Sequence, residues 1–378
     1  MSSELAWIAA GCLAGTLTGL VPGLHVNTLA ALALASLPLS PELGLAVVAA
    51  GTVHTFVGIV PATYLGAPGE ETFLTALPAH RLLLEGRGPE AVGASALASL
   101  AAALAALCLV LPYRWLLLEP GRLLPWLQQA TPWILGSVLG LLWLQAAARG
   151  LRAGTWTAIT LAAAGGLGLV ALNVPLHGLL VGAASPLLPL LTGLFGVPAL
   201  LWTLGRPPAI PVQRPAKRGS VPMAAPLGRG LGAAAFTAVL PGLTSSVATA
   251  MAHPVRPVPP LRLVATLSVV NTAHAVLALP VLWLIGRPRT GVAQAVDRTF
   301  PVAPWDLAPS EGLLVVLAAV AAASAFGFVA TVVCGAGAAR LAPRVDGRVL
   351  SGVALACIVA LVVLLTGFNG SILLTAAT

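Results

Sequence analysis

The sequence predicts an all-α polytopic membrane protein with two structural repeats, and three observations support this fold class. Apolar residues make up 58% of the chain, whereas about 45–50% is usual in soluble domains. Charged residues make up only 8%, and the mean hydropathy is +0.98. The tripeptide Pro-Gly-Leu occurs twice, each time at the end of an apolar stretch, where it should break a helix.

Apolar stretches between charged or Pro/Gly-rich gaps mark the expected helices. They lie at about residues 4–20, 24–39, 43–65, 91–111, 131–148, 155–173, 175–204, 229–252, 261–285, 312–339 and 348–366. A spanning helix needs roughly 20 residues, so we expect about 10–12 transmembrane or re-entrant helices. The first stretch has no basic leader and should be a retained span rather than a signal peptide.

A basic, Pro-rich segment at residues 205–230 divides the chain. It carries five Arg or Lys residues and no acid, so the positive-inside rule predicts a cytoplasmic linker. Residues 1–204 should form the first membrane repeat plus additional spans, and residues 231–378 the second repeat. We expect a multi-pass protein of the cell (plasma) membrane.

An internal repeat connects the two halves. The sequence GLVPGLHVNTLA at 19–30 aligns with AVLPGLTSSVAT at 238–249, at a constant offset of 219 residues. Downstream, HTFVGIVPATYLGAPGEETFL from His54 parallels HAVLALPVLWLIGRPRTGVAQ from His274. Duplicated halves with discontinuous helices are a recurring design of secondary transporters, and we expect the repeats to be inverted.

The two Pro-Gly breaks are the candidate substrate site. Helix N-termini carry free N–H groups and partial positive charge, which suit a carboxylate or a phosphate. The alternative is that both breaks only let helices pack closely. The candidate substrate-binding residues are Pro22, Gly23, Leu24, His25, Asn27, Thr28, Pro241, Gly242, Leu243, Thr244, Ser245, Ser246 and Asn271.

A second set of residues is suited to ion coupling or gating. Ionisable side chains at membrane depth are functional by default, although a carboxylate at the interface could simply cap a helix. Imidazole titrates near neutrality, but a histidine inside a membrane is often only a packing group. This set comprises His54, Thr55, Pro68, Gly69, Glu70, Glu71, His274 and Arg287. Coupling to a proton or a sodium ion is possible, and we expect no other cofactor.

Charge and motifs exclude several function classes. No Asp or Glu occurs between Pro120 and Val296, although this stretch carries twelve Arg or Lys residues, so an anion is a better substrate than a cation. The basic residues punctuate the gaps between spans, which argues against nucleic-acid binding. The four cysteines lie in apolar runs without metal-ligand spacing, so no metal site is expected. G-x-S-x-G, HExxH, Walker A and Rossmann motifs are absent from the sequence, which argues against an enzyme.

The motifs GLVPGLHVN, PATYLGAPGEETFLTA, GRGPEAV, PLHGLLVGAASPLLPLLTGLFGVPALL and VLPGLTSS resemble the TctA family, especially its shorter archaeal-type branch. This family comprises the large permease subunits of tripartite tricarboxylate transporters. The resemblance implies a secondary carrier for a di- or tricarboxylate, with a small membrane subunit and an extracytoplasmic solute-binding protein as partners. The chain departs from the family pattern where GRPR replaces a second Pro-Gly helix start.

The sequence supports three functions. The first is a secondary transporter that binds an organic anion between the repeats and couples its movement to an ion gradient. The second is a translocase for a polyprenyl-phosphate lipid carrier, which would use the same anion site with a lateral opening for the lipid. The third is a non-transporting membrane scaffold. Membrane lipid is an expected partner in each case, and a homodimer is left open.

Overall fold

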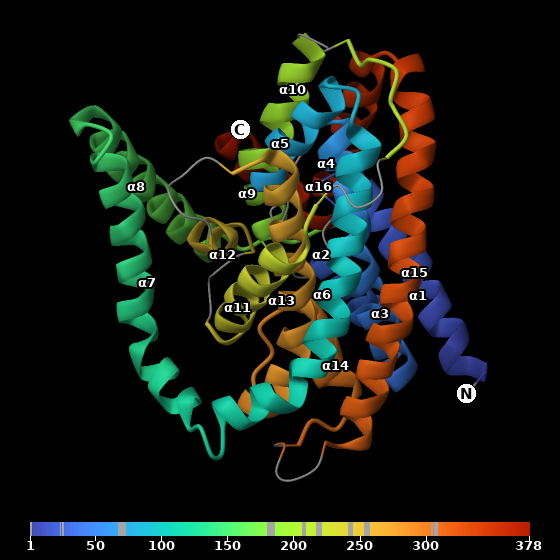
Figure 1. Ribbon diagram of the computed structural model, residues 1–378, viewed down its shortest axis with the longest axis vertical. Coiled ribbons are helices and arrows are strands. Elements are labelled where there is room, and N and C mark those ends of the chain that lie inside the picture. Colours follow the sequence, from blue (N-terminus) through green and yellow to red (C-terminus); the bar gives the residue numbers. More distant parts are fainter. Residues whose placement is uncertain are drawn as a thin grey trace.

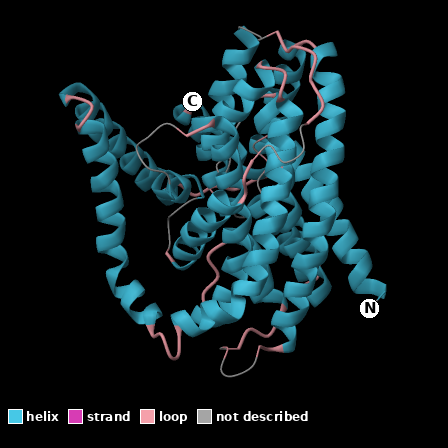
Figure 2. Cartoon of the chain, viewed as in Figure 1, coloured by secondary structure: helices cyan, strands magenta, loops and turns pink. Residues whose placement is uncertain are grey.

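Helices are the regular secondary structure in the part of the chain that the structure describes, and no strand occurs there. The computed structural model describes residues 2–22, 24, 26–66, 73–179, 186–205, 209–216, 221–240, 245–252, 258–303, 305 and 309–378. Its α-helices are α1 (Ser2–Leu20), α2 (Val26–Ser36), α3 (Pro41–Val57), α4 (Ile59–Tyr64), α5 (Phe73–Leu84), α6 (Gly88–Leu117), α7 (Leu123–Ala147), α8 (Leu151–Asn173), α9 (Leu187–Leu191), α10 (Val197–Gly205), α11 (Ala224–Val239), α12 (Ser245–Ala252), α13 (Pro260–Ile285), α14 (Gly291–Thr299), α15 (Glu311–Leu341) and α16 (Gly347–Ala377). A π-helical turn at Thr192–Gly196 and a 3₁₀ turn at Ala342–Arg344 complete the described helices (Figures 1 and 2).

The predicted all-α polytopic class is confirmed, whereas the two structural repeats stay a prediction. Within the described residues, eight helical stretches are long and apolar enough to cross a membrane. They comprise α1, the continuous α3 and α4, α6, α7, α8, α13, α15 with the turn after it, and α16. Several shorter helices lie between them, as expected for a chain with interrupted spans.

Both Pro-Gly breaks interrupt a helix where the sequence predicts. Helix α1 ends at Leu20, and α2 starts six residues later at Val26. Helix α11 ends at Val239, and α12 starts at Ser245. Leu240 already has extended backbone angles, because the following proline disfavours the helical conformation in the residue before it.

Helix α1 packs closely on α3 through glycine. A Cβ atom at Gly11 or Gly15 would overlap the backbone of Ala46 or Ala50 in α3. Small residues let two membrane helices approach this closely, where packing rather than hydrophobicity drives association. Helices α11 and α13 use the same device, since Gly230 lies against Thr266 and Val269.

These two helix pairs run in opposite directions. Successive contacts of Gly11, Gly15 and Gly19 follow α3 in order, so α1 and α3 are parallel. The contacts of Gly230 and Thr237 show that α11 and α13 are parallel as well. The beginning of α3 lies against Thr299 and Phe300, which follow the end of α13, so α3 and α13 are antiparallel. The pair α1–α3 is therefore antiparallel to the pair α11–α13, and the inverted repeats stay a prediction.

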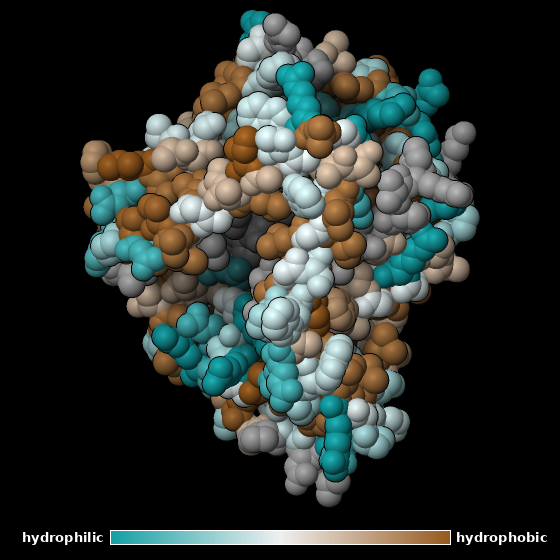
Figure 3. All heavy atoms as spheres, turned by 90° about the vertical axis from the view of Figure 1, so that its left-hand side faces the viewer, coloured by the Kyte–Doolittle hydropathy of each residue, from teal (hydrophilic) through white to brown (hydrophobic). Residues whose placement is uncertain are grey.

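Helix α13 occupies the centre of the bundle. Most of its side chains from Leu261 to Trp283 are buried, and it contacts α3, α5, α6, α11 and α12. By contrast, α7 and α8 form a hairpin that stands apart from the bundle (Figure 1). Trp126, Trp133 and Trp156 are among its exposed side chains. The face that carries this hairpin mixes hydrophobic with pale and hydrophilic side chains and is hollowed near its middle (Figure 3).

The basic segment at 205–230 contains the start of a helix. Helix α11 begins at Ala224, so the last seven residues assigned to the linker are helical. The described loop before it contacts the connection between α5 and α6. The Gln213 side chain accepts a hydrogen bond from the Gly88 N–H at 2.9 Å and donates one to the Leu83 carbonyl at 3.1 Å.

The glycine contact between α1 and α3 gives a stability prediction. We expect Gly15→Ala to lower the melting temperature of the detergent-purified protein, because the added methyl group meets the backbone of Ala50. Overpacking of this kind costs about 1–3 kcal/mol. Gly140→Ala in α7 is the control, since no described atom lies within 4 Å of its Cβ position. Equal melting temperatures for the two variants would contradict the close α1–α3 contact.

Candidate functional site

Each broken helix is held to its neighbour by a threonine and a histidine. Thr18 near the end of α1 lies 3.1 Å from Nδ1 of His54 in α3. Thr237 near the end of α11 lies 3.2 Å from Nδ1 of His274 in α13. The two threonines are 219 residues apart in the sequence, which is the offset of the Pro-Gly-Leu motifs. The same hydrogen bond therefore stands beside both breaks.

A buried polar contact close to these two histidines joins the two halves of the chain. The hydroxyl groups of Thr55 in α3 and Thr272 in α13 are 3.3 Å apart, and both side chains are buried. A second hydroxyl pair, Ser95 in α6 and Ser268 in α13, is separated by 2.7 Å. Buried polar groups are costly unless they are paired, so these contacts fix the relative position of α3, α6 and α13.

Asn271 contacts the start of the second re-entrant segment. Ser245, the first residue of α12, donates a hydrogen bond from Oγ to Oδ1 of Asn271 at 3.1 Å. Both side chains are buried. The structure therefore brings together two of the predicted substrate-binding residues, one from the break and one from the central helix.

Asn27 joins the first break to the second half of the chain. Its Oδ1 accepts a hydrogen bond from the backbone N–H of Gly291 at 2.8 Å. Gly291 is the first residue of α14, and Thr290 caps this helix by accepting a bond from the Ala293 N–H. The N-termini of α2 and α14 thus meet, and a Cβ at Gly291 would lie within 2.9 Å of the Asn27 Cα.

Arg289, rather than Arg287, reaches the second break. Arg287 is exposed, whereas the half-buried guanidinium of Arg289 donates a hydrogen bond to the Val239 carbonyl at the end of α11. A cation at this end complements the helix dipole. Burial lowers the pKa of Arg289, so an anionic partner would stabilise its charged form. Arg287 stays a predicted coupling or gating residue, and the structure adds Arg289 as the arginine that reaches the end of α11.

Several predicted site residues lie outside the described residues. They are Gly23, His25, Pro68, Gly69, Glu70, Glu71, Pro241, Gly242, Leu243 and Thr244, together with the side chain of Ser246. Pro22 is buried, and Leu24 and Thr28 are half-buried beside the first break.

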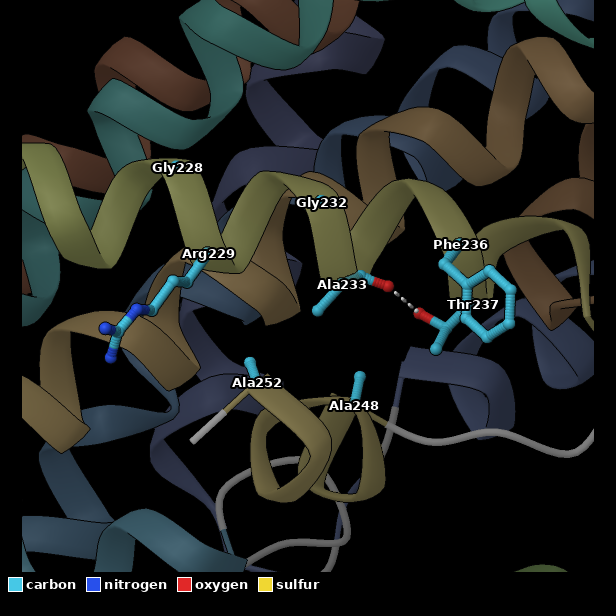
Figure 4. A pocket seen from close by; sticks show the side chains of 8 residues that line it. All are labelled: Gly228, Arg229, Gly232, Ala233, Phe236, Thr237, Ala248 and Ala252. Carbon is cyan, nitrogen blue, oxygen red and sulfur yellow. Dashed lines mark hydrogen bonds between the residues drawn. The ribbon is translucent and has the colours of Figure 1, made fainter. Parts of the chain in front are cut away.

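A cavity lies between α11 and α12, the two helices on either side of the second break (Figure 4). Its volume is about 320 Å³, and Thr237 lines it together with Phe236 and Ala248. The Thr237 hydroxyl also donates to the Ala233 carbonyl at 3.0 Å. The cavity therefore adjoins the hydrogen bond between Thr237 and His274.

The structure also reveals a buried carboxylate outside the predicted set. Glu90 in the first turn of α6 is 6% exposed and accepts a hydrogen bond from Nε of Arg87 at 2.7 Å. This bond raises the pKa of the Arg87 guanidinium. The sequence places Glu90 beside Gly88 and Pro89 at a helix start, a position in which most acids are simply exposed caps.

The comparison with known families decides the class of protein. Residues 5–378 match the family described as "Tripartite tricarboxylate transporter TctA family". The chain belongs to this TctA family. It is a family of transporters and not of enzymes.

One relative of the chain matches only in part. The uncharacterized protein MJ1079 of Methanocaldococcus jannaschii is 36% identical over 96 residues. This match covers 24% of the present chain and 23% of the relative, so the chain matches about a quarter of the relative's length. No solved structure matches the chain.

The contact between Asn27 and Gly291 predicts a specific pattern of substitutions. Asn27→Ala should lower the melting temperature, because the Gly291 N–H loses its acceptor, which costs about 1–3 kcal/mol. Asn27→Asp keeps an oxygen at the same place and should recover much of the loss. Asn173→Ala, which removes an exposed amide bonded within α8, is the control. A fully stable Asn27→Ala protein would rule out a structural role for this contact.

Proposed function

We propose that this TctA protein is a secondary permease for an organic anion of the di- or tricarboxylate class. The observation that carries the proposal is the meeting of the α2 and α14 N-termini through Asn27 and Gly291. Helix N-termini favour anions, and at this place residues from both halves of the chain come together. The substrate would bind beside the Pro-Gly breaks, between the halves.

The charges near the breaks agree with an anionic substrate. Arg289 lies at the end of α11, directly before the second break. The sequence between Pro120 and Val296, which includes the second break, contains no carboxylate side chain. A carboxylate substrate would thus meet backbone amides, hydroxyl groups and a guanidinium, which are the donors that bind such anions.

Alternating access would follow from the opposed halves. Transporters with inverted repeats expose a central site to each side in turn by rocking one repeat against the other. Here the parallel pair α1–α3 runs opposite to the parallel pair α11–α13, and α3 meets α13 at Thr55 and Thr272. Because both hydroxyl groups are buried, movement of the halves would have to replace this contact with another pairing.

His54 and His274 are the coupling groups that we propose, with Glu70 as a further one. Each histidine bonds the broken helix beside it, so a change of protonation would alter the hold on that helix. A proton is the coupling ion that this chemistry favours, and sodium is the alternative.

The proposed setting is the plasma membrane, with the basic segment at 205–230 on the cytoplasmic side. Since the family is named for tripartite transporters, we propose a small membrane subunit and an extracytoplasmic binding protein as partners. The binding protein would deliver the anion to the face opposite the basic segment.

Ligand-dependent stabilisation tests the substrate class. A ligand that binds only the folded protein stabilises it by about 2.7 kcal/mol at a concentration of 100 times Kd. We expect citrate or a smaller dicarboxylate to raise the melting temperature of the purified protein, whereas equally concentrated choline chloride should not. The absence of stabilisation by every carboxylate in such a panel would refute the proposed substrate class.

Uptake by proteoliposomes tests the site itself. Asn271→Ala should lower carboxylate uptake by about tenfold or more, the equivalent of roughly 1.4 kcal/mol of binding free energy. The reason is that it removes the partner of Ser245 at the start of α12. Thr375→Ala, which removes an exposed hydroxyl in α16, is the matched control. Wild-type uptake by a correctly inserted Asn271→Ala protein would exclude this site.

A further inference from the structure

The cavity between α11 and α12 opens beside a charged residue. Arg229 and Ala252 line one end, and Phe236, Thr237 and Ala248 line the other (Figure 4). The cavity end that carries Arg229 is formed by the first turns of α11 and the last residue of α12. On this side, α11 continues from the loop of the basic segment.

Arg229 lies beside the second and third turns of α13 rather than beside its first residue. The neighbouring Gly230 contacts Thr266 and Val269, which are six and nine residues beyond the start of α13 at Pro260. At a rise of 1.5 Å per residue, this places it about 9–14 Å along the central helix. Charged side chains inside a membrane bundle usually face a water-filled cavity or a substrate pathway, and Arg229 lines such a cavity.

Small residues keep the cavity open on both sides. Gly228 and Gly232 lie one turn apart on α11, and among the described residues no atom lies within 4 Å of a Cβ at either position. Ala248 and Ala252 occupy the equivalent spacing on α12. This pattern differs from that of Gly230 on the opposite side of α11, whose missing side chain allows close packing on Val269.

The inner end of the cavity adjoins the second break. Thr237 lines the cavity and bonds His274, and α12 begins at Ser245, which bonds Asn271. A ligand that passed Arg229 would therefore next meet the hydroxyl group of Thr237 and then the break. The cavity thus extends from an exposed cation to Thr237, whose partner His274 lies on the central helix α13.

We propose that this cavity is the entrance to the anion pathway from the side of the basic segment, opposite the face that the binding protein serves, and that Arg229 attracts anions to it. The inference rests on the proposed permease function. The ligand is a carboxylate or phosphate group on a small or partly apolar body, because one cation stands at the mouth of an otherwise apolar cavity. Its source is either a soluble organic acid or a lipid headgroup.

Cysteine labelling tests the entrance without relying on transport. Ala252→Cys is made in a protein whose four native cysteines are replaced, and is labelled with anionic or cationic methanethiosulfonate reagents of similar size. The anionic reagent should react faster, and Arg229→Gln should lower this preference by about tenfold, since local cationic fields raise anion on-rates by roughly 10- to 1,000-fold. Arg262→Gln, an exposed arginine on the neighbouring α13, should leave the preference unchanged.

A second variant closes the cavity. Gly232→Leu should slow labelling of Ala248→Cys at the inner end by about tenfold or more, while the open space at Gly232 lets the protein keep its melting temperature. Gly140→Leu in α7 is the matched control, because its position is also open. The proposed entrance would be overturned if both reagents label Ala252→Cys slowly, or if Arg229→Gln leaves the preference for the anionic reagent unchanged. Either result would count against the entrance even if carboxylates still stabilise the protein.

Protection identifies the source of the anion. Citrate that slows labelling of Ala248→Cys would support the entrance for a soluble organic acid. Protection by short-chain phosphatidic acid in mixed micelles, but not by citrate, would support the entrance while replacing the proposed carboxylate with a lipid phosphate. If neither compound protects, the cavity is not an anion pathway.

Discussion

A helix that breaks inside a membrane releases backbone groups that must find partners within the protein, and this constraint organises the structure. The two interrupted helices, α1 and α11, each lie against a continuous helix that covers them, α3 or α13. In both cases a threonine of the broken helix bonds a histidine of the continuous one. The described residues that flank the breaks, Pro22, Leu240 and Ser245, are accordingly buried in the protein.

The two breaks are completed by different groups, although the helix pairs around them correspond. At the first break, the Asn27 side chain accepts a bond from an amide at the N-terminus of α14. At the second, the Arg289 guanidinium binds a carbonyl at the C-terminus of α11. Arg289 lies in the short segment between α13 and α14, and Asn27 binds Gly291 at the end of that segment. The segment thus contacts the helices beside both breaks, and it places a positive charge beside the second break only.

The α7–α8 hairpin shows how little a membrane protein needs a compact shape. Its helices are apolar on most sides and only 6% of each spanning window is buried. In water such a surface would collapse onto the bundle, but in lipid there is no hydrophobic gain from doing so. Each helix satisfies its own backbone hydrogen bonds, so the hairpin can stand apart and leave the face of α11 and α12 open.

The sequence by itself determined the membrane class, the helix breaks at the two Pro-Gly-Leu motifs, and the polar residues beside the breaks, because composition and proline act locally. Only the tertiary structure decided which of these residues meet. The sequence analysis names Arg287, yet the direction in which the chain leaves α13 turns Arg289 toward Val239. Likewise, the pairing of Asn27 with Gly291 joins positions 264 residues apart. Helical periodicity specifies the face on which a side chain lies, but the packing of distant helices decides what it touches.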